Sequence, residues 1–119
     1  MLAVVLALAG VTLTASPDAG QDKYQPEVAL AAEQRLAQAG EVLGAAWMCR
    51  GIDRTRLRAA MRKVEAMIDK GVDDNQQYYA ARHILDKGID KGKSAIGKHE
   101  TDCRRADAAL GDLEKQLGP

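Results

Sequence analysis

The 119-residue sequence contains no phenylalanine, one tryptophan (Trp47) and only three prolines. β-Sandwiches and barrels fill their cores with aromatic and β-branched side chains, so this shortage argues against an all-β fold. The small number of prolines and a charged fraction of 29% argue against a disordered chain. Basic and acidic residues balance at 17 each, which argues against binding to nucleic acid or membranes through bulk charge. What is abundant is alanine, and the length allows a single domain of closely packed helices.

The N-terminal segment is apolar and uncharged. Leu2–Leu13 is interrupted only by Gly10 and Thr12, and it is shorter than the roughly 20 apolar residues of a membrane span. We predict a signal peptide or N-terminal hydrophobic segment over residues 1–20, followed by a single helical domain over residues 24–119. No basic residue precedes the run and no Ala-x-Ala follows it closely, so an upstream start, an N-terminal anchor or a buried helix stays open as an alternative.

The two cysteines, Cys49 and Cys103, lie far apart in the sequence. They form neither a Cys-x-x-Cys motif nor a zinc-ligand pattern with paired histidines, and in an exported protein such a pair usually forms one disulfide. Closing a loop of about 54 residues would stabilise the fold by roughly 4 kcal/mol in the chain-entropy model. In a cytosolic protein, both would instead be small buried thiols.

Apolar residues recur at three- and four-residue spacing in four segments, and no segment alternates with the period of a strand. The predicted helices run from Pro26 to near Cys49, from Asp53 or Thr55 to Gly71, from Asp73 or Asp74 through His99 to Cys103, and over a shorter segment from Ala106 to Leu117. Short connections make consecutive helices antiparallel. The sequence therefore predicts an all-α, up-down-up-down four-helix bundle stapled by one disulfide, with both cysteines at the same end.

Three glycines, Gly88, Gly92 and Gly97, fall within the third predicted helix, where each costs about 1 kcal/mol relative to alanine. Gly92 lies on the apolar stripe, so close approach of a neighbouring helix or of Trp47 would explain it. The alternative is that the helix breaks here into two shorter pieces.

The order of these features resembles a family of small exported helical proteins of alphaproteobacteria, conserved hypothetical proteins with one cysteine pair. The matching positions are Leu43, Gly44 and Cys49 at the end of the first helix, and Lys91, Gly92 and Cys103 at the end of the third. The resemblance spans residues 30–117. It implies a helical fold and an exported location, and it implies no activity.

Basic side chains are concentrated in residues 50–63, where Asp53 is the only acid. Arg54, Arg58 and Arg62 are spaced by four residues and share one helix face. In the predicted topology the start of this second helix meets Lys98, Arg104 and Arg105, whereas Asp69, Asp73, Asp74 and Asp86 fall toward the opposite end. A basic end of this kind can bind phosphate, carboxylate or an acidic partner. The candidate anion- or partner-binding residues are Arg50, Arg54, Arg58, Arg62, Arg104 and Arg105. The alternative is a solvated face, partly neutralised by Asp53, Glu100 and Asp102.

No motif for catalysis, for a metal or for a cofactor is visible. His83 and His99 are about 160° apart around a continuous helix and cannot share one metal ion. Met48, Met61 and Met67 are predicted to fill the core, the alternative being a copper site. Tyr78 is predicted to lie in the core and Gln76, Gln77 and Tyr79 to face solvent, although they could instead line a groove for sugar or peptide.

These observations favour an exported, non-catalytic binding or accessory protein, periplasmic or secreted, whose ligand is unknown. We expect its partner to be a protein or another anionic cell-envelope ligand, with no nucleic acid, no stable membrane span and no cofactor. A periplasmic acid-stress chaperone is the alternative, suggested by small size, a long-range disulfide and an alanine-rich helical body. The third class, an enzyme without a recognisable motif, would require a deep pocket with convergent polar groups.

Overall fold

The computed structural model describes the backbone of residues 26–119 and the side chains from residue 32 onward, and residues Glu33–Pro119 form one compact unit. The predicted signal peptide or hydrophobic segment over residues 1–20 lies outside the described residues. Four helices follow one another: α2 (Pro26–Trp47), α3 (Arg54–Gly71), α4 (Asn75–Gly97) and α5 (Cys103–Leu117). No strand occurs between residues 26 and 119.

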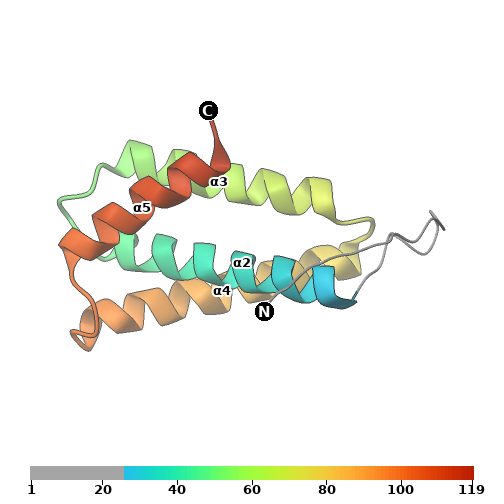
Figure 1. Cartoon of the computed structure of the whole chain (residues 1–119), viewed down its shortest axis with the longest axis horizontal. Helices are drawn as coiled ribbons and strands as arrows, with labels where there is room; N and C mark the ends of the chain where they lie inside the picture. The colour runs from blue at the N-terminus through green and yellow to red at the C-terminus, as the bar shows by residue number, and fades with distance from the viewer. Residues whose placement is uncertain (1–25) are drawn as a thin grey trace. The chain divides into compact units, whose positions relative to one another are not determined.

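Consecutive helices run in opposite directions, so α2 and α4 point one way and α3 and α5 the other (Figure 1). The connections are short turns of three to six residues, and α3 packs against both α4 and α5. The predicted all-α, up-down-up-down four-helix bundle is confirmed.

Aspartates begin three of the helices. Oδ1 of Asp53, Asp74 and Asp102 accepts a hydrogen bond from the backbone N–H of Thr55, Gln77 and Arg105, at 2.9, 2.8 and 2.9 Å respectively. Each carboxylate satisfies one of the N–H groups that the first turn of a helix leaves without a partner. The starts of the second and third predicted helices are thereby fixed at Asp53 and Asp74.

The predicted continuation of the third helix to Cys103 is wrong, because α4 ends at Gly97. His99 has φ 60°, its N–H bonds the Ile96 carbonyl at 3.1 Å, and the Glu100 N–H bonds the Ala95 carbonyl at 2.9 Å. This is the Schellman arrangement, which uses a left-handed residue to close a helix. Because the helix ends here, Asp102 lies outside α4 and serves as the N-cap of α5.

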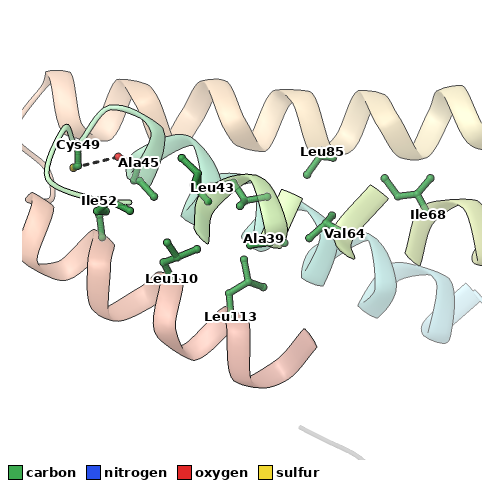
Figure 2. Close-up of a cluster of buried hydrophobic side chains, with 14 residues drawn as sticks. Ala39, Leu43, Ala45, Cys49, Ile52, Val64, Ile68, Leu85, Leu110 and Leu113 are labelled. Carbon is green, nitrogen blue, oxygen red and sulfur yellow. Dashed lines mark hydrogen bonds between the residues drawn. The ribbon is translucent and has the colours of Figure 1, made fainter. Parts of the chain in front are cut away.

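One large aliphatic side chain from each helix meets at the centre of the core: Leu43, Leu57, Leu85 and Leu110 are all at most 1% exposed. Figure 2 shows this cluster continuing along α3 through Val64 and Ile68.

The prediction that three methionines fill the core is wrong for two of them. Met48 is 48% exposed and Met67 is 59% exposed, and only Met61 packs against the core. Met48 follows the last residue of α2, while Met67 stands next to Ile68, which takes the core-facing position. Tyr78 packs against the core, and Gln76, Gln77 and Tyr79 are exposed, as predicted.

The parallel helices α2 and α4 touch through glycines. A Cβ on Gly40 would lie 2.5 Å from the Leu85 carbonyl oxygen and 3.0 Å from the Gly88 Cα, and one on Gly92 would lie 2.8 Å from the Ala45 nitrogen. Only residues without a side chain allow two backbones to approach so closely. The α4 helix is continuous through Gly88 and Gly92, so the alternative of a broken helix is wrong, and the neighbour that explains Gly92 is α2.

The structure joins Cys49 to Cys103 in a disulfide with a Cα–Cα distance of 5.7 Å, as predicted. Cys49 is buried just after α2, and Cys103 is the exposed first residue of α5. The bond fastens the end of the first described helix to the beginning of the last.

Candidate functional site

The disulfide lies at one end of the bundle, where α2 and α4 finish and α3 and α5 begin. We call this end, residues 47–58 and 95–107, the disulfide pole. It holds seven basic and four acidic residues, a formal excess of three positive charges. The seven basic side chains fall into two groups, those bonded within the fold and those exposed to solvent.

Arg54 is bonded within the fold. Its guanidinium donates from Nη1 to the Trp47 carbonyl oxygen at 2.9 Å and from Nη2 to the Cys49 carbonyl oxygen at 3.1 Å. The same group stacks on the Trp47 ring, 5.3 Å from its centroid. Arg54 thus satisfies carbonyls at the C-terminus of α2 and fixes the Trp47 ring by a cation–π contact. It is a positioning residue for this turn.

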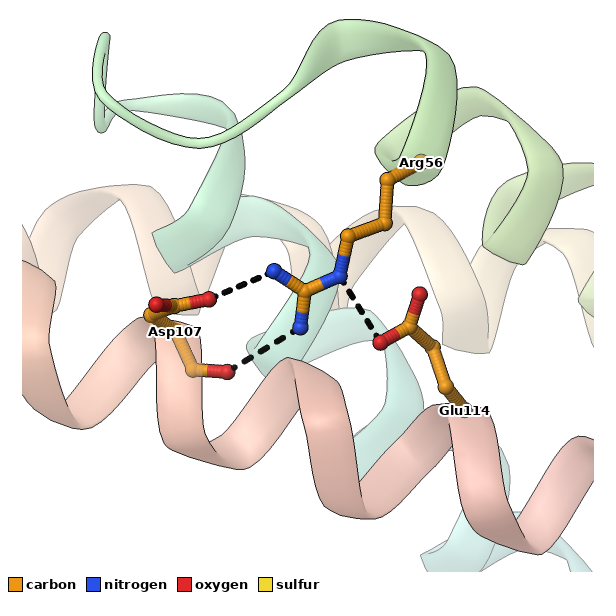
Figure 3. Close-up of polar contacts among 3 residues, drawn as sticks. All are labelled: Arg56, Asp107 and Glu114. Atoms are coloured by element: carbon orange, nitrogen blue, oxygen red, sulfur yellow. Dashed lines mark hydrogen bonds and ion pairs between the residues drawn. The ribbon is translucent and has the colours of Figure 1, made fainter.

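Arg56 is also bonded within the fold, between two carboxylates of α5 (Figure 3). Nη1 contacts Asp107 Oδ1 at 2.6 Å and Nε contacts Glu114 Oε1 at 2.8 Å. Hydrogen bonding to Asp107, followed by that to Glu114, raises the pKa of Arg56 above its usual range. This charge is neutralised and links α3 to α5.

The remaining predicted arginines, Arg50, Arg58, Arg62, Arg104 and Arg105, are exposed. Arg50 and Arg104 directly follow the two bonded cysteines, so their Cα atoms lie no more than about 13 Å apart. Arg62 stands about 12 Å along α3 from Arg54 and outside the pole. The structure therefore brings together Arg50, Arg104 and Arg105, with Arg58 on the adjoining first turns of α3.

Two adjacent apolar side chains are exposed at the same pole, Trp47 at 43% and Met48 at 48%. The sequence does not reveal this pair, because it predicts Met48 in the core and leaves open whether Trp47 is buried. The one sequence feature that points to their exposure is their position directly before Cys49, where the first predicted helix ends. In the structure they follow Ala46, the last buried residue of α2.

The opposite end of the bundle is acidic. Asp69, Asp73 and Asp74 lie at the end of α3 and the turn before α4, and all three are exposed.

Asp86, predicted to fall toward this acidic end, is engaged in an ion pair. Its carboxylate accepts a hydrogen bond from Arg82 Nε at 3.2 Å, and the same guanidinium donates to the Glu65 carboxylate on α3. Hydrogen bonding to Glu65 is the main cause of the raised pKa of Arg82. The Arg82–Glu65 contact links α3 to α4, while the Arg82–Asp86 pair lies within α4 and partly neutralises Asp86, which stands midway along that helix and not at the acidic end.

Other parts of the described structure offer little for chemistry. His83 and His99 are both exposed, and residues 26–119 contain no group of three or more histidine, cysteine or acidic side chains able to hold a metal ion. An open groove between α3 and α5 is lined by apolar side chains, among them Ala59, Ala60 and Leu117, and by the charged side chains of Lys63, Glu114 and Lys115. Two of these charged groups are bonded within the fold: Lys63 Nζ donates to the Gly118 carbonyl at 2.7 Å, and Glu114 accepts from Arg56.

None of the helices described between residues 26 and 119 is long and apolar enough to cross a membrane. Comparison of the chain with protein-family models, with curated proteins and with solved structures finds no match. The resemblance to the exported alphaproteobacterial proteins therefore stays a prediction.

Proposed function

We propose that this protein is an exported, non-catalytic accessory protein that binds an anionic partner through its disulfide pole. The observation that carries the proposal is the gathering of exposed Arg50, Arg104 and Arg105 around the Cys49–Cys103 bond. Arginine offers a planar set of donors that suits carboxylate and phosphate groups, often in pairs of parallel hydrogen bonds.

The disulfide prepares this site for binding. Arg50 belongs to the turn after α2 and Arg104 to the first turn of α5, and the bond between their neighbours holds the two segments together. An anion that contacts both segments does not have to bring them together first, which lowers the ordering cost of binding. With Asp69, Asp73 and Asp74 at the other end, the charge separation would also orient the molecule toward an anionic surface.

Export is supported by the disulfide itself. Such bonds persist in oxidising compartments and are rare in the cytosol. Together with the apolar, uncharged segment over residues 1–20, this favours a periplasmic or secreted protein. Mass spectrometry of the protein from its host tests this proposal: a processed N-terminus and the mass loss of one disulfide support export, and an unprocessed chain with two thiols contradicts it.

A matched pair of variants tests the binding site. The pole variant carries Arg50→Gln, Arg104→Gln and Arg105→Gln, and the control carries Arg35→Gln, Lys70→Gln and Lys115→Gln, three exposed basic residues outside the pole. The two variants have the same net charge. On immobilised dextran sulfate, a polyanion, the control should elute at nearly the salt concentration of the wild type and the pole variant well below it. Equal losses would show that net charge alone causes retention, and the proposal would be wrong.

A second candidate, the acid-stress chaperone, is favoured by the number of carboxylates that hold the fold together. Three helices begin at aspartates, and Arg56 and Arg82 are bonded to four carboxylates. Hydrogen bonds to these carboxylates raise the pKa of both arginines, so both stay charged over the whole acid range. Loss of helical content near pH 3, together with suppressed aggregation of an unfolded client protein, would support this candidate, and an unchanged circular dichroism spectrum at that pH would contradict it.

A further inference from the structure

The exposed pair Trp47 and Met48 distinguishes the disulfide pole from a simple basic surface. Single exposed apolar residues are common on proteins, but here two adjacent large ones lie among arginines. Tryptophan is enriched at the headgroup level of bilayers, and basic side chains beside it are attracted by anionic lipids. The other exposed large apolar side chains from residue 32 onward, Met67 and Tyr79, belong to the half of the bundle that carries Asp69 and Asp73, whose charge anionic lipids repel.

The orientation of this pair is fixed before any partner arrives. The Arg54 guanidinium stacks on the Trp47 ring and donates to the carbonyls of Trp47 and Cys49, on either side of Met48. Cys49 is in turn held by its disulfide. The turn that presents the two apolar side chains is therefore tied at both ends, and little conformational freedom is lost when it is covered.

We propose that the disulfide pole docks on the surface of a bilayer containing anionic phospholipids. Trp47 and Met48 enter the headgroup region, while Arg50, Arg104 and Arg105 contact lipid phosphates. This inference rests on the proposed function, since it names the anionic partner of that site. The chain lies on the bilayer by one end and does not cross it.

The balanced net charge does not oppose this docking. Arg54 and Asp69 are separated along α3 by about 22 Å, whereas the screening length at physiological ionic strength is about 8 Å. A bilayer in contact with the pole therefore experiences mainly the excess of basic residues there.

The size of the pole favours a bilayer over a folded acidic protein. The exposed large apolar side chains of the pole are two, Trp47 and Met48. A stable protein–protein interface buries about 800 Å² on each partner around an apolar centre. Lipids rearrange around a small apolar and basic tip, so a bilayer does not need a large complementary surface.

Trp47, the only tryptophan, reports directly on the docking. The full chain is mixed with vesicles of phosphatidylglycerol and phosphatidylcholine, or of phosphatidylcholine alone, and its fluorescence and co-sedimentation are measured. With phosphatidylglycerol present, we expect emission at shorter wavelength, weaker quenching by acrylamide and binding that falls with salt. The apolar segment Leu2–Leu13 is present in every sample, so binding caused by it would also occur with phosphatidylcholine alone.

The same matched variants identify the contacts. The pole variant Arg50→Gln, Arg104→Gln, Arg105→Gln should partition on the order of a hundredfold less, because each charge contributes about fivefold. The control Arg35→Gln, Lys70→Gln, Lys115→Gln should partition nearly as the wild type does. Met48→Gln, which leaves Arg54 and Trp47 intact, should weaken partitioning several-fold at unchanged helical content.

Each contrary outcome separates this inference from the proposed function. Suppose that the pole governs retention on dextran sulfate, but that neither the wild type nor any variant co-sediments with phosphatidylglycerol vesicles. The lipid inference is then wrong and the proposed function stands. If the pole governs neither, both are wrong. Co-sedimentation with unchanged Trp47 emission, or equal binding by the two charge variants, also overturns the docking proposed here.

Discussion

At the residue scale, His99 occupies a backbone position that suits glycine. Its φ of 60° lies in the left-handed region, where a side chain costs about 1–2 kcal/mol. Part of that cost would be offset by the greater freedom that glycine gives the unfolded chain. We predict that His99→Gly raises the free energy of unfolding by about 1 kcal/mol. Urea denaturation followed by circular dichroism measures it, and a lower midpoint would contradict the assignment of this turn.

The close contact between α2 and α4 requires glycine, whose side chain is a single hydrogen atom. A Cβ at Gly92 would lie 2.8 Å from the Ala45 nitrogen, a backbone atom that cannot rotate away. We predict that Gly92→Ala destabilises the protein by about 2 kcal/mol, because the two helices must separate. Equilibrium urea unfolding of the variant and the wild type measures the loss.

Gly97→Ala is the control on the same helix. A Cβ there would have no heavy atom within 4 Å, so the higher helix propensity of alanine should leave stability unchanged or raised by up to about 1 kcal/mol. Equal destabilisation by both substitutions would mean that the close contact is not what requires Gly92.

At the scale of the elements, Arg56 links α3 to α5 through two carboxylates. Its side chain is 31% exposed and those of Asp107 and Glu114 are 56% and 35% exposed, so water screens much of the attraction. We predict that Arg56→Gln lowers the free energy of unfolding by about 1 kcal/mol, and by less in high salt. Chemical denaturation at low and high salt measures both effects.

Arg58→Gln is the matched control for Arg56, since Arg58 is exposed on the same helix. Its effect should stay within about 0.5 kcal/mol. A comparable loss in the two variants, with the same salt dependence, would show that overall charge rather than the bridge to Asp107 and Glu114 is responsible.

The helices themselves were predictable from the sequence because their signals are local. Apolar spacing indicates all four, and Asp53 and Asp74 stand where caps are expected. The end of α4 is not evident from the sequence, because the apolar spacing continues through Ile96 to His99. The left-handed residue of the turn is His99 rather than glycine, which is the usual signal for a helix end. Gly92 indicates that another segment approaches the helix closely, but the identity of that segment depends on how the helices pack.

The candidate site was predictable only as a collection of charges. The exposed arginines beside Cys49 and Cys103 follow from topology and the disulfide. Arg56 could not be recognised as neutralised, because its partners are 51 and 58 residues away. Met48 is predicted in the core because methionine usually fills gaps there, and the sequence does not show that α2 ends one residue earlier, at Trp47.

At the scale of the whole molecule, the disulfide closes a loop across 54 residues. We predict that Cys103→Ser lowers the free energy of unfolding by about 4 kcal/mol, because the unfolded chain regains the freedom that the bond removes. Cys103 is exposed, so the serine hydroxyl stays in water. Thermal unfolding with and without a thiol reductant measures the loss, and a wild type equally stable after reduction would contradict this origin of stability.

The position of that bond has a consequence for proteolysis. Residues 50–102, which include all of α3 and α4, lie inside the closed loop. A protease that cuts the turn between these helices, at exposed Asp73 for example, yields two fragments that stay joined. The nicked protein should migrate as one species on a non-reducing gel and as two after reduction, so a single backbone break does not separate the halves of this bundle.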